Sequence, residues 1–412
     1  MSQPDLSGAA PTGALPDLFR GILRRSDKYT VGTWYPTTYG TQTGTYLDFG
    51  GTAENNIRPA ASAAFGLAVS LATGAYDPAT TGVSVTAARA TCATLVRSLA
   101  FRHRATTAGG WGRAPQSNLW TALAAQAAWL VLPDLTASQQ AMVARMLVDE
   151  ADWRISRPIP YWKDRNGTEL TPGDTKAEES SWNAMVLQAA VVMLPLHPHR
   201  GAWLRRCRLL MISAYSRSHD LTSHEIVDGI DISAFLRGWN INSDGTLVNH
   251  ARIHPDYMCT LPHNLQAVCL FALIGFAPPE AAFHDADLVY SALTNRVFAS
   301  PPFDPPGGTI YIPGSEDLYY PQGNDWGTRR RMQAATTDVM MNAFGRSAAA
   351  ADWAMRHGGE VARMQSRSST GQTYLAASED TYAGREQWVA MHAGWAWLAL
   401  WVVATGRYVP PA

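Results

Sequence analysis

Side chains that can bind or transfer protons are concentrated in residues 244–264 of the sequence. The stretch contains His250, His254, Asp256, Tyr257 and His263. The Asp-Gly pair at its start is a turn signal, and Pro255 suits the first position of a helix, because the N–H that proline lacks would have no partner there. An apolar helical run follows over 265–276. The sequence therefore predicts a titratable cluster on the loop that enters a buried helix.

One chemistry suited to these side chains is removal of the C5 proton of a uronic acid. The reaction needs a base, and it needs a group that stabilises the carboxylate as the carboxylate becomes an enolate. Tyr or His can be the base, Tyr can protonate the leaving oxygen, and Asn, Arg or protonated His can stabilise the charge. Residues of these types stand in order at three successive junctions between long loops and helices: Asn183, His254, Tyr257 and Arg329.

A metal site is an alternative interpretation of the same stretch. His250, His254 and Asp256 would suffice as zinc ligands. Their surroundings, residues 249–255, lack a helical pattern, and the sequence contains no HExxH motif. We therefore expect chemistry without a metal or another cofactor.

The other long loops supply further polar and aromatic side chains. Those expected to contact a substrate are Asn55, Asn56, Arg58, Trp111, Gln116, Trp182, His250, Tyr320, Asn324, Asp325, Trp326, Glu379, Tyr382, Arg385 and Glu386. Glu178 and Glu179 lie in the first turn of a predicted helix, where carboxylates also stabilise the helix dipole. Paired carboxylates, with Glu178 or Glu179 among them, would equally serve an inverting glycoside hydrolase as acid and base.

The helices that carry these residues follow an alternating pattern. Long loops lead to helices that are apolar on most faces, whereas short turns lead to amphipathic helices richer in Arg. A helix that is apolar all round is buried, and an amphipathic helix lies on a surface. Five pairs of this kind are predicted: 55–104, 116–155, 177–217, 257–297 and 328–364. The helices 15–25 and 385–404 remain to form a sixth pair.

The pattern predicts an all-α fold, an (α/α)6 toroid of inner and outer helices closed by pairing of the first and last helices. Residues 12–412 would form this single domain, and residues 1–11 a disordered tail. All long loops would then gather where the inner helices begin. Free N–H groups and positive dipole ends at that rim give a mild preference for anions.

Composition limits the possible partners of the chain. The 412 residues carry a formal net charge of −1, which argues against non-specific binding to nucleic acid. No apolar stretch has transmembrane length, and the N-terminus lacks the basic and apolar regions of a signal peptide. We expect a cytoplasmic protein as the sequence is written, or a secreted one whose signal has been removed. Nothing in the sequence indicates an oligomeric state.

The set Asn183, His254, Tyr257 and Arg329 on a predicted toroid resembles that of the polysaccharide lyases of the chondroitin AC and hyaluronate lyase type. The resemblance extends more loosely to the heparinase and alginate lyase groups, and it covers residues 15–405. It implies that Asn183 neutralises the carboxylate, that His254 assists or acts as base, that Tyr257 is base and acid, and that Arg329 binds the sugar acid. Polysaccharide cleavage by β-elimination is thus the expected function, with glycoside hydrolysis as the alternative. A cyclase or prenyl-processing toroid would need DDxxD or DxDD motifs, which are absent, and a non-catalytic binding toroid is a further alternative.

Overall fold

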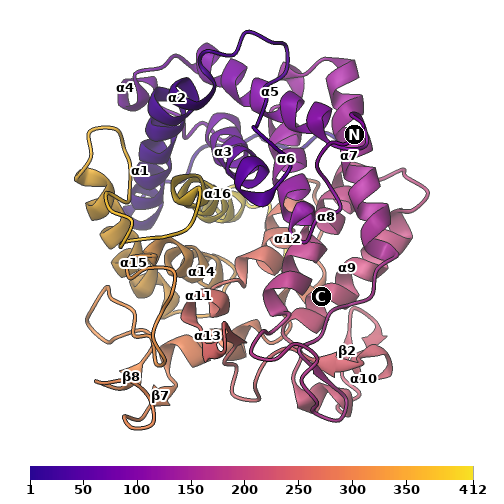
Figure 1. The fold of residues 1–412 in the computed structure, drawn as a ribbon, viewed down its shortest axis with the longest axis vertical. Coiled ribbons are helices and arrows are strands. Elements are labelled where there is room, and N and C mark those ends of the chain that lie inside the picture. Colours follow the sequence, from indigo (N-terminus) through magenta and orange to yellow (C-terminus); the bar gives the residue numbers. More distant parts are fainter. Residues whose placement is uncertain (412) are drawn as a thin grey trace.

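The structure is a computed structural model that describes residues 1–411. The chain is predominantly helical, so the predicted all-α class is confirmed (Figure 1). The longer helices are α1 (Ala14–Tyr29), α3 (Glu54–Ala72), α5 (Val85–Arg102), α6 (Ser117–Leu130), α7 (Ala137–Ile155), α8 (Ala177–Met193), α9 (Arg200–Ala214), α12 (Pro262–Ala272), α13 (Ala286–Thr294), α14 (Arg331–Ala343), α15 (Ala350–Ser366) and α16 (Arg385–Ala404).

Short elements lie mainly in the long connections. The short helices and helical turns are η1 (Thr30–Trp34), α2 (Tyr35–Tyr39), α4 (Pro78–Thr81), η2 (Leu132–Asp134), η3 (Ser218–Leu221), α10 (Ile232–Phe235), α11 (Pro255–Met258) and η4 (Glu280–Phe283). Small antiparallel pairs join β1 (Lys163–Asp164) to β4 (Gly238–Trp239), β2 (Ile226–Val227) to β3 (Ile230–Asp231), β5 (Val248–Asn249) to β6 (Arg252–Ile253), and β7 (Val297–Phe298) to β8 (Gly308–Thr309).

A buried layer of helices forms the centre of the molecule. Helices α3, α6, α8, α12, α14 and α16 are buried along most of their length. Helix α3 packs against α6, α6 against α8, and α8 against α12, while α12 contacts both α14 and α16. Helix α16 packs in turn against α14 and α3 (Figure 1). Apart from α14, these helices are rich in Ala and large apolar residues on most faces, which is why they are stable only inside the protein. Helix α14 is buried although it carries Arg331, Gln333 and Asp338.

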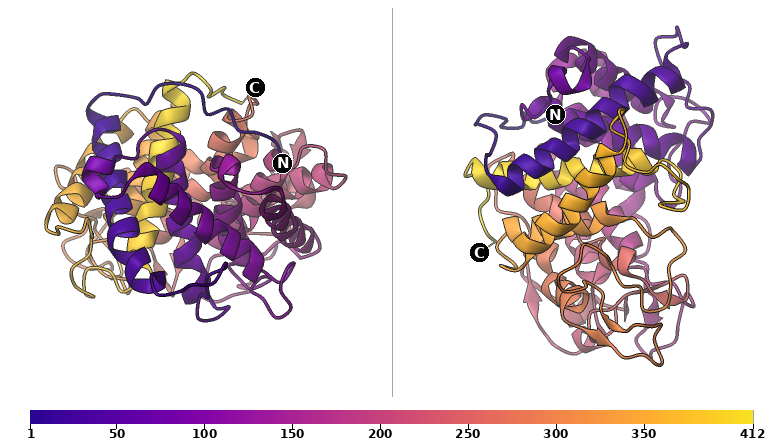
Figure 2. Two further views of the ribbon diagram at one scale, coloured as in Figure 1. Left: turned by 90° about the horizontal axis from the view of Figure 1, so that it is seen from above. Right: turned by 90° about the vertical axis from the view of Figure 1, so that its left-hand side faces the viewer.

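A second layer covers this centre. Helix α5 packs on α3, α7 on α6, α9 on α8, and α15 on α14. Helix α1 packs on α16 and α15, and Figure 2 shows α1 (indigo) and α16 (yellow) running side by side. The first and last helices are therefore neighbours, as the alternating pattern predicted.

Three of the predicted helices differ from the sequence-based expectation. In the predicted pair 257–297, the outer member is reduced to η4 and α13, and the part that packs against α12 is η4. The helix expected over 257–276 is split into α11 and α12, because Pro262 lacks the N–H that a continuous helix would need. The helix expected over 15–25 continues through η1 and α2 to Tyr39. Its extension is held by tertiary packing, since Val31 and Tyr39 are buried there although Thr, Val and Gly are weak helix formers.

The first residues, for which a disordered tail was expected, are tied to the ends of the buried helices. The Ser2 N–H donates to Met193 O at 2.7 Å, and the Asp5 N–H donates to Leu273 O at 2.8 Å. The Trp129 indole donates to Ser2 O at 2.9 Å. This segment thus satisfies carbonyls at the C-terminal ends of α8 and α12 that would otherwise have no partner.

Among residues 1–411, none of the helices combines the length and the apolar character needed to cross a membrane.

Candidate active site

The N-terminal turns of the buried helices surround a cavity of about 250 Å³, here called the central cavity. Its walls include Glu54 of α3, Gln116 at the start of α6, Glu178 of α8, Arg330 at the start of α14 and Trp388 of α16. The long loops add His250, Trp326 and Tyr382, and α11 adds Tyr257. The predicted gathering of the long loops where buried helices begin agrees with this lining.

Two further cavities adjoin the central cavity, and the three together are here called the groove. A cavity of about 450 Å³, the loop-side cavity, shares Gln116, Glu178, His250 and Tyr257 with it and adds Trp182 and Glu179. A cavity of about 650 Å³, the aromatic cavity, shares Tyr382 with it. A groove of this extent suits an elongated ligand better than a compact one.

A chain of hydrogen-bonding groups reaches the central cavity through His250. The Nδ1 atom of His250 lies 2.7 Å from Asp325 Oδ2, and its Nε2 atom lies 3.3 Å from the Tyr257 hydroxyl. Because Asp325 accepts the Nδ1 proton, Nε2 is left as a proton acceptor that faces Tyr257. Carboxylate, imidazole and phenol are thereby aligned as a proton-transfer chain at the cavity wall.

The turn between β5 and β6 positions the His250 imidazole. His250 and Ala251 fill a two-residue turn with φ angles of 51° and 59°, values that usually call for Asn or Gly. The turn is held from outside, because the Ala251 N–H donates to Gly173 O at 2.9 Å. A Cβ on Gly173 would come within 2.9 Å of the Ala251 Cα, so only glycine allows this approach.

His254 supports this chain from behind. It is fully buried, and its Nε2 lies 3.0 Å from Asp325 Oδ1. Burial tends to raise the pKa of Asp325, but the hydrogen bonds from His254 and His250 outweigh it and hold that pKa below its usual value. Burial lowers the pKa of His254, which favours the neutral imidazole. Asp325 is therefore kept ionised by two imidazoles that orient it.

Tyr257 and Glu178 face the cavity with perturbed acidities. Burial, followed by the nearby Glu178 carboxyl, raises the pKa of Tyr257 well above its usual value, so the phenol holds its proton. Burial is also the main reason that the pKa of Glu178 rises from 4.5 to about 8, with Asp174 adding to the effect and Arg330 opposing it. The Glu178 carboxyl is thus protonated at neutral pH and can donate a hydrogen bond.

Arg330 is the guanidinium of the central cavity. Its Nη1 lies 2.8 Å from Asp256 Oδ2, and its Nε lies 3.4 Å from Asp380 Oδ2. Burial opposes its charge, but Asp256 and Asp380 outweigh burial and raise the pKa of Arg330. The Tyr320 hydroxyl donates to the other oxygen of Asp256 at 3.2 Å. This buried network holds the Arg330 guanidinium in one position between Asp256 and Asp380.

A second guanidinium, that of Arg58, braces the wall shared by the central and aromatic cavities. It stacks on the Tyr382 ring at 3.8 Å, forms an ion pair with Glu54, and donates to Ala383 O at 2.7 Å. Arg58 is 2% exposed, so it positions Tyr382 and Glu54 and has little surface of its own for a ligand.

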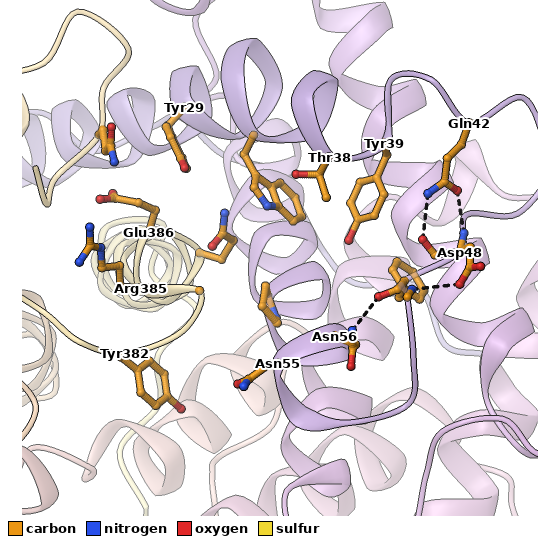
Figure 3. Close-up of a pocket in the computed structure, with 17 residues that line it drawn as sticks. Tyr29, Thr38, Tyr39, Gln42, Asp48, Asn55, Asn56, Tyr382, Arg385 and Glu386 are labelled. Carbon is orange, nitrogen blue, oxygen red and sulfur yellow. Dashed lines mark hydrogen bonds between the residues drawn. The ribbon is translucent and has the colours of Figure 1, made fainter. Parts of the chain in front are cut away.

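The aromatic cavity is lined by aromatic rings and amides. Tyr29 and Tyr39 lie on one side of it, with amides of Gln42, Asn55 and Asn56 nearby (Figure 3), and Trp34 also lines it. Tyr382, Arg385 and Glu386 form the opposite side (Figure 3). Glu386 accepts the N–H groups of Thr373 and Tyr374, and burial raises its pKa to about 7.

Several buried polar atoms that line the groove have no hydrogen-bond partner among residues 1–411. They are Gln333 Oε1, Arg330 Nε, Trp388 Nε1 and Trp182 Nε1. An unpartnered buried polar atom is costly, and a polar ligand or water in the groove can complete these four.

Other predicted site residues lie elsewhere. Arg329 points outward, with its Nη1 3.4 Å from Glu360 Oε1 and its side chain 41% exposed. Asn183 is buried on α8 and lines none of the three cavities described above. Trp111 is packed in the core against His103 and donates to Leu99 O at 3.0 Å. The structure therefore places these three residues outside the three cavities described above.

Two predicted ligand-contacting residues instead shape the loops. Asn324 accepts the Trp326 N–H at 3.1 Å and donates to Gly327 O, which holds Trp326 over the cavity. Glu379 pairs with Arg367 and accepts the Leu375 N–H at 2.7 Å. Both residues therefore act on the ligand site only through the backbone that they hold.

Some of the groove was missed by sequence reasoning. The missed lining residues are Arg330, Gln333, Tyr29, Trp34 and Tyr39. The run of three arginines at 329–331 was a signal for one cavity-facing cation, but it did not say which member faces inward. The aromatic residues lie in the segment that was expected to be a loop and is helical.

Three groups of residues in the described part of the chain have the composition of a metal site, and one of them lies at the central cavity. Ligand atoms of His250, His254 and Asp325 all lie within 4.8 Å of one another. Two imidazoles and a carboxylate can bind zinc or another transition metal. In the arrangement described above, each Asp325 oxygen is hydrogen-bonded to one imidazole, so a metal would have to replace both protons.

Comparisons of the chain with protein family models and with curated proteins found no match.

Proposed function

We propose that the protein cleaves a polysaccharide by β-elimination at a uronic acid residue. The observation that carries the proposal is the Asp325–His250–Tyr257 chain, which ends at a cavity wall beside the protonated Glu178 carboxyl. Elimination needs a base and an acid close together, and Tyr257 and His250 form such a pair.

In the proposed reaction His250 and Tyr257 act as a unit that shares one proton. One of the two atoms, His250 Nε2 or the Tyr257 hydroxyl oxygen, accepts the C5 proton of the uronate, and the other delivers a proton to the glycosidic oxygen. The C5–H and C4–O bonds break and a C4=C5 double bond forms, without water. Direct proton transfer over the 3.3 Å between His250 Nε2 and the Tyr257 hydroxyl then restores the pair. The raised pKa of Tyr257 supports its part as the proton donor.

The uronate carboxylate gains charge as C5 loses its proton, so it needs hydrogen-bond donors. Glu178 in its protonated form and the amides of Gln116 and Gln333 line the same cavity. A carboxyl group kept neutral by burial can stabilise an enolate in this way. His254, by contrast, orients Asp325 and has no place beside the substrate.

We further propose that the helices form an (α/α)6 toroid. The proposal is supported by the sequence of packing neighbours, which runs from α3 through α6, α8, α12, α14 and α16 back to α3. It is also supported by the outer partners α5, α7, α9, α15 and α1. A toroid would place the groove at the rim where the inner helices begin.

A glycoside hydrolase is the second candidate, because the raised pKa of Glu178 also suits a general acid. An inverting hydrolase needs a second, free carboxylate as base. Glu54 and Asp256 share the central cavity with Glu178, but they are ion-paired with Arg58 and Arg330. Each of these carboxylates already has a cationic partner, and this favours elimination over hydrolysis by an unpaired base.

The test is digestion of a panel of uronate-containing polysaccharides, with ultraviolet absorbance and reducing ends followed in parallel. Elimination gives a conjugated, ultraviolet-absorbing product together with each new reducing end. New reducing ends without ultraviolet absorbance would replace the lyase proposal by the hydrolase. Absence of both signals on the whole panel would count against polysaccharide cleavage.

A further inference from the structure

The cations of the central and loop-side cavities are already engaged by acidic groups of the protein. In the central cavity, Arg330 is held between Asp256 at 2.8 Å and Asp380 at 3.4 Å. In the loop-side cavity, Lys176 Nζ lies 2.7 Å from Asp174 Oδ2 and 3.4 Å from Glu179 Oε2. A cation with two acidic neighbours has little attraction left for a further anion.

Of the two guanidinium groups next to the aromatic cavity, Arg58 is engaged in the same way, since it is paired with Glu54 and stacked on Tyr382. Arg385 differs, because it donates to the carbonyls of Ala376, at 3.0 Å, and of Asp380 through Nη1 alone. Engaged cations are therefore a property of the central and loop-side cavities, where the cleaved unit would lie.

Carboxyl groups outnumber cations on the walls of the central and loop-side cavities. Among residues 1–411 these walls contain Glu54, Asp174, Glu178, Glu179 and Asp256. The cationic members are Lys176 and Arg330. Even with Glu178 protonated, the walls carry an excess of negative charge, and this charge repels a polyanion.

The remaining donors of the central cavity are uncharged. The amides of Gln116 and Gln333 and the indole N–H of Trp388 line it, and the Trp388 N–H has no partner among residues 1–411. Neutral donors of this kind bind hydroxyls and a single carboxylate, but they do not compensate a dense series of charges.

We propose that the substrate is a uronan of low charge density, whose cleaved unit carries one carboxylate bound by uncharged donors and no sulfate or phosphate ester. The inference rests on the proposed function, because it assigns the substrate class of the same groove. Sulfated and phosphorylated chains would then be rejected by repulsion, because Asp174 and Glu179 line the loop-side cavity in which an ester group would lie.

Binding tests the inference separately from cleavage. The probes are size-matched oligosaccharides of chondroitin, heparosan, hyaluronan and alginate, each in unsulfated and sulfated form, titrated by calorimetry. We expect at least one unsulfated backbone to bind, and its sulfated form to bind at least ~10-fold more weakly. This difference in affinity should shrink as salt screens the repulsion. A sulfated form that binds more tightly than its unsulfated partner would overturn the inference, as would failure of every unsulfated backbone to bind.

The charge argument also predicts a change of preference in Glu179→Gln and Glu179→Lys. Glutamine removes one of the two acidic neighbours of Lys176, and lysine replaces it by a cation, so binding of the sulfated form should rise stepwise relative to the unsulfated form. Glu169→Gln is the matched control, since Glu169 forms a similar pair with Lys163 at 3.6 Å but lies outside the three cavities. An unchanged preference in both Glu179 variants would overturn the inference. Binding without an unsaturated product would instead overturn the proposed function alone.

Discussion

Replacement of Glu178 by glutamine tests the acidity of the cavity directly. The folded chain raises the pKa of this carboxyl from 4.5 to about 8, chiefly by burial. Between these two values the folded protein retains a proton that the unfolded chain has released, so the folded state loses stability as the pH rises. One pKa unit corresponds to about 1.4 kcal/mol, which sets a ceiling of about 5 kcal/mol for the full shift. Glutamine has no proton to lose and avoids this cost.

We therefore expect Glu178→Gln and the wild type to have equal stability below pH ~4.5, where the carboxyl is protonated in both states. The variant should become progressively more stable above that pH, and the difference should level off above pH ~8, where both states have lost the proton. Thermal unfolding measured at a series of pH values, at one scan rate, checks the expectation. Glu179→Gln is the control, because Glu179 is the next residue and is ion-paired with Lys176, and it should show no such gain.

The same variant separates the two candidate reactions. If Glu178 donates a hydrogen bond to the substrate carboxylate, glutamine can still donate one, and much of the activity should survive. The wild-type activity should then decline above pH ~8, whereas that of the variant should not. If Glu178 is the acid of a hydrolase, glutamine should remove activity. A Glu178→Gln protein that is no more stable than the wild type at high pH would refute the assignment of a protonated carboxyl, whatever its activity.

Four further expectations follow from the geometry. Tyr257→Phe should lower kcat by ~10²-fold or more with unchanged thermal stability, because it removes the transferable proton; near-normal turnover would exclude Tyr257 from the reaction. Arg330→Lys should reduce both stability and activity, since one ammonium cannot reproduce the contacts to its two acidic neighbours. The control Arg329→Lys should leave stability and activity within error of the wild type. Equal effects of the two substitutions would contradict the inward placement of Arg330. Trp34→Ala should raise KM for long oligosaccharides and leave that for the shortest cleaved ones unchanged, and a uniform rise would argue against an extended groove. Zinc should inhibit by binding the two imidazoles that face Asp325, and restoration by a chelator distinguishes this from denaturation; activation by zinc would show that the metal belongs to the reaction.

The division of the helices into a buried and a covering layer was predictable because it depends on burial. Helices such as α8 and α16 are apolar on every face, and that pattern alone places them inside. The direction in which a single side chain points is harder to predict. One residue along a helix turns the side-chain direction by about 100°, so the sequence could place an arginine at the start of α14 but could not distinguish Arg329 from Arg330.

The sequence also could not show which histidine atoms face Tyr257. His250 reaches the Tyr257 hydroxyl because it occupies a left-handed turn between β5 and β6, and neither His250 nor Ala251 is a residue that usually marks such a turn. The turn is imposed from a distance by Gly173. The His254 ring also lies against Tyr257, with 4.8 Å between ring centroids, but its Nε2 atom faces Asp325 at 3.0 Å. Contacts between distant loops decided the site, and local sequence carries little of that information.

The packing of α16 has a consequence for how the chain is made. Its buried residues cover α3 and α14, and α1 rests on it as well. During synthesis α3 leaves the ribosome long before α16 does, so its apolar surface stays uncovered while most of the chain is translated. The nascent protein therefore depends on rapid completion or on chaperones that shield this surface. Synonymous codon changes that slow translation before residue 385 should reduce the soluble yield, although they alter no contact in the finished molecule.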